Sequence, residues 1–87
     1  MTTMHTISEV SVRTGIPKDL LRQWERRYGY PDPQRDNNGD RIYTTRQLDK
    51  LSLIRQLLDQ GKRPGKLVEL ETAELQAMLK VPDAIFD

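Results

Sequence analysis

A three-residue break between two helical segments constrains the fold of this chain more than any other feature. Thr6-Ile7-Ser8-Glu9 has the S/T-x-x-E form of a capping box, so a helix is expected to begin at Ile7. Gly15 is a C-terminal stop signal, and Pro17 suits the start of a second helix, where no backbone N–H partner is needed. Two helices joined by so short a turn predict a helix-turn-helix. The expected apolar side of the first helix consists of Ile7, Val10 and Val12.

The second helical segment, around Leu20 to Gly29, has two unlike faces. At helical spacing the apolar side carries Leu20, Leu21, Trp24 and Tyr28, and the opposite side carries Lys18, Asp19, Arg22, Gln23 and Arg26. This polar side, the front of the helix, suits the major groove of DNA, because Arg pairs with guanine and Gln pairs with adenine. Asp accepts from cytosine or orients an Arg. A surface helix with a solvated charged face fits these residues equally well, and the following segment decides between the two interpretations.

A basic hairpin is expected directly after this helix. Residues 29–33 contain two prolines and cannot continue a helix. Asn38-Gly39 then signals a tight turn in which both residues accept a positive φ. Arg35 and Arg41 lie on the two arms, and alternation puts Tyr43 on the same face as Arg41. A hairpin of this kind beside a recognition helix is typical of a wing, although an ordinary surface hairpin is the alternative. The wing residues expected to contact DNA are Arg35, Asn38, Arg41 and Tyr43, with the Tyr43 hydroxyl donating to a phosphate.

A leucine stripe marks a third helix. Thr44-Thr45-Arg46-Gln47 is again a capping-box pattern, Leu48, Leu51, Ile54, Leu57 and Leu58 follow at helical steps, and Gly61 ends the helix. The stripe spans too few heptads for a coiled coil, so it is expected to form core. Shorter helices are expected from Pro64 and around 74–79. The expected core residues are Leu21, Trp24, Tyr28, Leu48, Leu51, Ile54 and Leu58, and Glu25 is expected to pair with a nearby Arg.

The composition agrees with one small, mainly α domain. We predict that it covers residues 1–80 and that residues 81–87 are a flexible tail or the start of a linker. The chain of 87 residues contains no cysteine, so disulfides and thiolate metal sites are excluded, and His5, the only histidine, is expected to be a surface or strand-packing residue. Without a phosphate-binding glycine loop or a cluster of catalytic residues, an enzyme is not expected. No apolar run approaches the ~20 residues of a membrane span, which predicts a cytoplasmic protein.

Positive charge is clustered at particular positions of the chain rather than being in large overall excess. The net charge is only +1, but residues 18–28 carry four cations against two acids, and the expected wing adds Arg35 and Arg41. Seven acids follow the wing, beyond the expected DNA face: Asp49, Asp59, Glu69, Glu71, Glu74, Asp83 and Asp87. The resulting dipole would orient the domain on DNA. Arg13, on the first helix, is placed to reach a phosphate.

The order of these motifs resembles the DNA-binding domain of the MerR family of bacterial transcription regulators, over about residues 4 to 70. The motifs are Leu21-Arg22-x-Trp24-Glu25-Arg26-Arg27-Tyr28-Gly29, Gly39-x-Arg41-x-Tyr43 and Leu48-x-x-Leu51-x-x-Ile54-x-x-Leu57-x-x-x-Gly61. The Trp-Glu-Arg-Arg-Tyr-Gly form is similar to that of the cobalamin-binding, light-responsive repressors of carotenoid genes. The departures are Pro17, where the family commonly has a Ser cap, and Leu20, where a polar residue is frequent.

This resemblance implies a winged helix-turn-helix with a β-hairpin wing and additional C-terminal helices, acting in the bacterial nucleoid on double-stranded operator DNA. It implies no cofactor in this chain, because cobalamin would belong to a C-terminal domain. We expect a monomer as an isolated domain, an oligomer for a full-length protein, and a basic face that an acidic antirepressor protein can also bind. Two alternatives are an excisionase-like architectural DNA-binding protein, against which the additional helices weigh, and a protein-interaction module with an acidic partner.

Overall fold

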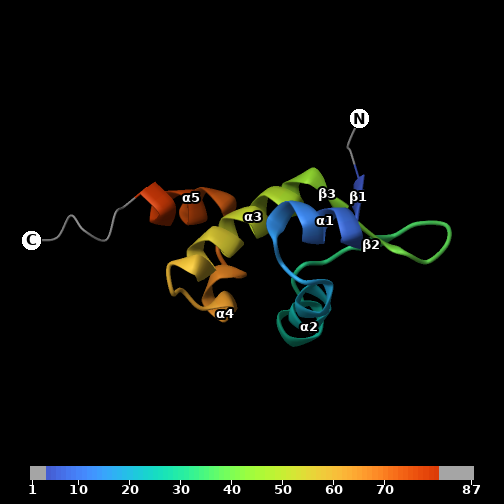
Figure 1. Cartoon of the computed structure of the whole chain (residues 1–87), viewed down its shortest axis with the longest axis horizontal. Coiled ribbons are helices and arrows are strands. Elements are labelled where there is room, and N and C mark those ends of the chain that lie inside the picture. The colour runs from blue at the N-terminus through green and yellow to red at the C-terminus, as the bar shows by residue number, and fades with distance from the viewer. Residues whose placement is uncertain (1–3, 81–87) are drawn as a thin grey trace, which may run out of the picture.

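The structure, a computed structural model, describes residues 4–80 and is built around one long helix. The elements are β1 (Met4–Thr6), α1 (Ile7–Thr14), α2 (Lys18–Tyr28), β2 (Gln34–Arg35), β3 (Arg41–Thr44), α3 (Thr45–Asp59), α4 (Pro64–Leu67) and α5 (Thr72–Lys80). Helix α3 runs through the middle, with α1 and the small sheet near its N-terminal end and α4 and α5 near its C-terminal end (Figure 1). The mainly α winged helix-turn-helix is confirmed. The predicted tail, 81–87, lies outside the described residues, and the domain boundary stays a prediction.

The start and end of α1 follow the local signals. The Thr6 hydroxyl accepts from the backbone N–H of Glu9 at 3.2 Å, and the Glu9 carboxylate accepts from the backbone N–H of Thr6 at 3.0 Å, which completes the capping box. Gly15 caps the other end in the left-handed conformation. The expectation for Val12 is wrong, because its side chain is 84% exposed. Val12 lies two residues, about 200°, around the helix from the buried Val10 and therefore faces solvent.

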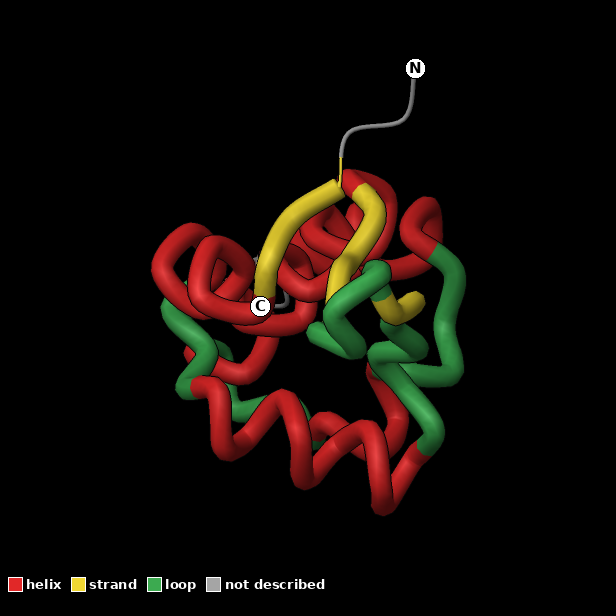
Figure 2. The backbone as a smooth tube through the Cα atoms, turned by 90° about the vertical axis from the view of Figure 1, so that its right-hand side faces the viewer, coloured by secondary structure: helices red, strands yellow, loops and turns green. Residues whose placement is uncertain are grey.

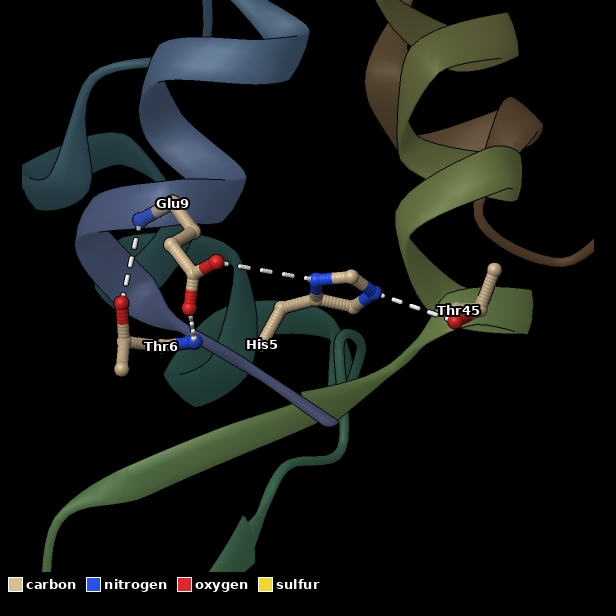
Figure 3. A network of polar contacts seen from close by, with 4 residues as sticks. All are labelled: His5, Thr6, Glu9 and Thr45. Carbon is tan, nitrogen blue, oxygen red and sulfur yellow. Dashed lines mark hydrogen bonds and ion pairs between the residues drawn. The ribbon is translucent and has the colours of Figure 1, made fainter. Parts of the chain in front are cut away.

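The sheet has three antiparallel strands in the order β1-β3-β2, one strand more than the expected hairpin. Strand β1 pairs with β3, so that His5 lies opposite Tyr43. His5 is 6% exposed, and its Nε2 lies 3.0 Å from the Thr45 hydroxyl on α3, while its Nδ1 lies 4.0 Å from a Glu9 carboxylate oxygen (Figure 3). The strand-packing role of His5 is confirmed, and its contact with Thr45 ties the chain's first strand to the central helix.

The turn of the wing differs from the expected type. Among residues 4–80 only glycines have a positive φ, and in the wing this is Gly39, at +83°. The backbone N–H of Gly39 donates to the Asp36 carbonyl, and that of Asp36 donates to the Asp40 carbonyl, so the loop has three residues and ends in a left-handed glycine. The Asp36 carboxylate accepts from the N–H groups of Asn38 and Asp40, both at 2.9 Å. The Asn-Gly signal located the hairpin correctly, but the positive φ expected for Asn38 is wrong.

The core lies on two sides of α3. Leu51 and Leu57 are both 0% exposed although they lie about 120° apart around an α-helix. Helix α1 packs on α3 from one direction and α5 from another, which explains why both leucines are covered. Leu58, expected in the core, is only partly buried, and the same holds for Tyr28. The other expected core residues, Leu21, Trp24, Leu48, Leu51 and Ile54, are confirmed as buried.

The start of α3 uses only half of its capping-box pattern. The Thr44 hydroxyl accepts from the Gln47 backbone N–H at 3.1 Å. The Gln47 side chain, however, donates to the Asp32 carbonyl at 2.9 Å, which ties the segment after α2 to α3. None of the helices within residues 4–80 combines the length and the apolar character that crossing a membrane requires.

Candidate nucleic-acid interface

Side-chain hydrogen bonds hold the turn between α1 and α2. The Ser11 hydroxyl donates to the Ile16 carbonyl at 2.7 Å, and the Thr14 hydroxyl donates to the Val10 carbonyl at 2.7 Å while accepting from the Ile16 N–H at 3.2 Å. Ile16 itself is 1% exposed. Gly15 has φ +79°, which an L side chain rarely adopts. The direction in which α2 leaves α1 is therefore set by a closed network rather than by a flexible link.

The apolar side of helix α2 packs into the core, and its polar front faces solvent. Leu21 is 0% exposed and Trp24 3% exposed, which places both in the core. Pro17 caps the helix without a side-chain bond, but its carbonyl accepts from the N–H groups of Leu20 and Leu21. Helix α2 stands apart from the layer of α1 and α3 at the bottom of Figures 1 and 2. The five residues expected on the DNA-facing side of this helix all lie on α2, and none of them is buried: Lys18, Asp19, Arg22, Gln23 and Arg26.

The front of α2 contains one ion pair and three side chains without a partner. Arg22 donates to the Asp19 carboxylate at 3.1 Å, which is the contact expected if Asp19 orients Arg22. Within residues 4–80, Lys18, Gln23 and Arg26 are exposed and take part in no side-chain hydrogen bond or ion pair. Their donors are therefore available to an external acceptor without loss of an internal contact.

The wing is joined to the recognition helix by an ion pair. Arg41 Nε donates to Glu25 Oε1 at 2.9 Å, and both side chains are only 25% exposed. This hydrogen bond holds the pKa of Arg41 above its ordinary value. The expected pairing of Glu25 is confirmed. Arg35 lies opposite Arg41 in the sheet, is exposed, and donates to the Gly39 carbonyl at 3.1 Å. The pair between Arg41 and Glu25 thus fixes where the wing stands relative to α2.

Tyr43 is a core residue, which contradicts its expected contact with a phosphate. Its side chain is 0% exposed, and its hydroxyl is buried without a hydrogen-bond partner in the described part of the chain. Burial raises the pKa of Tyr43. Alternation did place Tyr43 and Arg41 on one face of β3, but this is the face on which helices α1 and α3 pack. The hydroxyl therefore cannot reach DNA in this conformation.

The remaining expected contacts lie on the surface. Arg13 is exposed on α1, and Asn38 is exposed in the turn of the wing. Other exposed cations were not proposed as site residues: Arg27, which lies 5.6 Å from the centre of the Tyr28 ring, and Lys62, Arg63 and Lys66 around α4. A Cβ added to Gly65 of α4 would lie 3.4 Å from the Tyr28 ring, so α4 adjoins the C-terminal end of α2. Only the fold brings these two basic segments together.

A helix-turn-helix with an exposed basic front and a wing docked beside it defines the class of winged helix-turn-helix DNA-binding domains. Within this class, the family described as "MerR HTH family regulatory protein" matches residues 5–74. The chain therefore belongs to the MerR family of DNA-binding transcriptional regulators.

A curated relative and two solved structures show the extent of this similarity. The chain is 34% identical over 71 residues to the HTH-type transcriptional regulator MlrA of Escherichia coli (strain K12), covering 82% of this chain but only 29% of MlrA. The solution structure of the N-terminal domain of the CarA repressor has a TM-score of 0.60 at 28% identity, covering 92% of this chain and 91% of that one. HiNmlR, a MerR family regulator lacking the sensor domain, bound to promoter DNA, has a TM-score of 0.64 at 23% identity, covering 95% and 60%. The relatives are transcription regulators, which supports a non-enzymatic role.

Proposed function

We propose that this chain is the operator-binding domain of a repressor of carotenoid-biosynthesis genes, with α2 in the major groove of double-stranded DNA and the wing beside it. The observation that carries DNA binding through α2 is its front, where the donors of Lys18, Gln23 and Arg26 have no partner among residues 4–80 on a helix of fixed orientation. The likeness to the N-terminal domain of the CarA repressor supports repression, and the Trp24 to Gly29 motif supports the carotenoid genes. MlrA, which has a comparable likeness, is named only as a regulator.

The residues of this interface divide into two groups by their chemistry. Arg22 and Arg26, one turn apart on α2, have the fork geometry that pairs with guanine O6 and N7, and Gln23 has the amide that pairs with adenine. Lys18, which is a point charge, suits a phosphate or a guanine.

Arg13, Arg35 and Asn38 lie outside the recognition helix and suit phosphate contacts, which position the domain without reading sequence. Arg41 acts chiefly by holding the wing, since its Nε is occupied by Glu25.

The salt dependence of binding tests the electrostatic part of the proposal. If four or five cations of this face contact phosphates or adjoining bases, the slope of log K against log salt concentration is about −4 per domain. The measurement is fluorescence anisotropy of a labelled 30-base-pair duplex at several salt concentrations. A slope near zero would contradict DNA binding by this surface.

Substitutions separate base reading from positioning. Arg26→Ala should cost on the order of 1–3 kcal/mol on the best site selected from random sequences, and less on an unselected duplex. Arg35→Ala should weaken both duplexes equally, as expected for a backbone contact. Arg46→Ala, which removes an exposed arginine from α3, is the matched control. Equal losses for both variants on both duplexes would restrict α2 to positioning.

We further propose that the isolated domain is a monomer and that a full-length protein joins copies to occupy a two-part operator. Linking two copies should raise affinity by 10²–10⁴ if the linker spans the half-sites. A stable dimer of this chain in sedimentation equilibrium at micromolar concentration would refute the monomer.

The same cations form charge-assisted hydrogen bonds with carboxylates as well as phosphates, so an acidic antirepressor protein fits this face and would compete with DNA. Arg22→Ala and Arg26→Ala should then weaken both partners. A partner whose binding survives both substitutions would contradict the shared surface.

A further inference from the structure

A groove lies near the C-terminal end of α3, outside the front of α2. It has a volume of about 420 Å³ and is lined by Lys62, Arg63, Lys66, Leu67, Glu69, Leu70 and Met78. Leu67 is 1% exposed and belongs to the core, while Leu70 and Met78 are partly buried against it. The groove therefore presents an apolar surface built on α4, the turn after it, and α5.

The charged residues around this groove are unbalanced. Lys62, Arg63 and Lys66 are exposed, and within residues 4–80 none of the three takes part in a side-chain hydrogen bond or ion pair. Among residues 4–80, Glu69 is the only acid that lines the groove. These three cations against one acid give the groove a local excess of positive charge.

We propose that this groove binds an amphipathic, acidic helix of a partner protein. Leucine or phenylalanine side chains on one face of that helix would cover Leu70 and Met78, and carboxylates flanking them would pair with Lys62, Arg63 and Lys66. Charge complementarity selects an acidic partner, and the apolar lining selects one with apolar side chains. A phosphate backbone supplies the charge but cannot cover the apolar surface. Met78 adapts its shape readily, as methionines do at helix-binding surfaces.

The test uses the 87-residue chain and a fluorescein-labelled 16-residue peptide with leucines at positions i, i+4 and i+8 and glutamates beside them. A second peptide carries glutamine in place of every glutamate. We expect the acidic peptide to bind in fluorescence anisotropy and to shift the amide resonances of residues 62, 63, 65–70 and 78 in ¹H–¹⁵N spectra. The glutamine peptide should bind at least fivefold more weakly, because the charge pairs are lost.

Two kinds of variant test the two halves of the surface. Leu70→Ser and Met78→Gln should each weaken the acidic peptide about tenfold, and using both guards against one variant that fails to fold. Val12→Ser, on the exposed face of α1, is the matched apolar control. Arg63→Glu should weaken the peptide about fivefold, and Arg46→Glu, at the other end of α3, should not.

The outcomes that would overturn the proposal are distinct from failure of the DNA-binding proposal. Binding that maps to α2, or that survives Leu70→Ser and Met78→Gln in folded protein, would show that the groove is not the site. If Arg63→Glu weakened a 30-base-pair duplex while the peptide did not bind at millimolar concentration, these cations would serve DNA instead. Resonances of the groove that move on dilution without peptide would show that a second copy of the chain covers it.

Discussion

Breaking the ion pair between the wing and the recognition helix should destabilise the domain by a measurable coupling energy. Two unit charges about 4 Å apart interact by roughly 4 kcal/mol at an effective dielectric constant of 20, but desolvation and side-chain ordering offset most of this. Fully exposed pairs retain about 0.2–1 kcal/mol. Arg41 and Glu25 are each only 25% exposed and meet at 2.9 Å. We therefore expect a coupling of about 1.5 kcal/mol, above the exposed range.

Urea unfolding of Glu25→Ala, Arg41→Ala and the double variant measures this coupling in a double-mutant cycle. The matched control is the pair of Arg22 and Asp19, whose side chains are 41% and 99% exposed and whose coupling should be about 0.3 kcal/mol. The coupling of Arg41 with Glu25 should also survive 0.5 M salt better, because screening acts mainly on exposed charges. Equal couplings for the two pairs would refute the argument that the covered pair positions the wing.

Three further outcomes follow from packing, pH and backbone conformation. Leu57→Ala should cost about 2–5 kcal/mol in urea unfolding, and Leu58→Ala clearly less, because only Leu57 is completely buried. The hydrogen bond from the Thr6 backbone N–H holds the pKa of Glu9 below its ordinary value of 4.5. The contribution of the ionised Glu9 to the stability of the fold is therefore present above pH 4.5 and is lost as the pH falls through the lowered pKa. The melting temperatures of wild type and Glu9→Gln should converge in acid. Gly39→Ala should cost about 1 kcal/mol through its φ of +83° alone, since no atom lies within 4 Å of the added Cβ; a neutral effect in urea unfolding would show that the turn relaxes.

The sequence by itself determined the features that depend on neighbouring residues. The capping box of Thr6 and Glu9, the stop at Gly15, the amphipathic α2 and the position of the hairpin all rest on contacts within about four residues. Such contacts can be recognised from spacing because the helix and the turn bring these residues together wherever they occur. The placement of Lys18, Gln23 and Arg26 on the exposed front followed directly from this periodicity.

Only the tertiary structure decided which face of β3 is covered by helices and which contacts form between residues far apart in the sequence. Helices α1 and α3 pack on the face of β3 that carries Tyr43, so Tyr43 is a core residue instead of a DNA contact. The Gln47 side chain likewise bonds to Asp32 rather than to its own helix start. Partners that are 15 to 40 residues apart, such as Gln47 with Asp32 and Thr45 with His5, leave no periodic signal in the sequence, because their meeting depends on how whole elements pack.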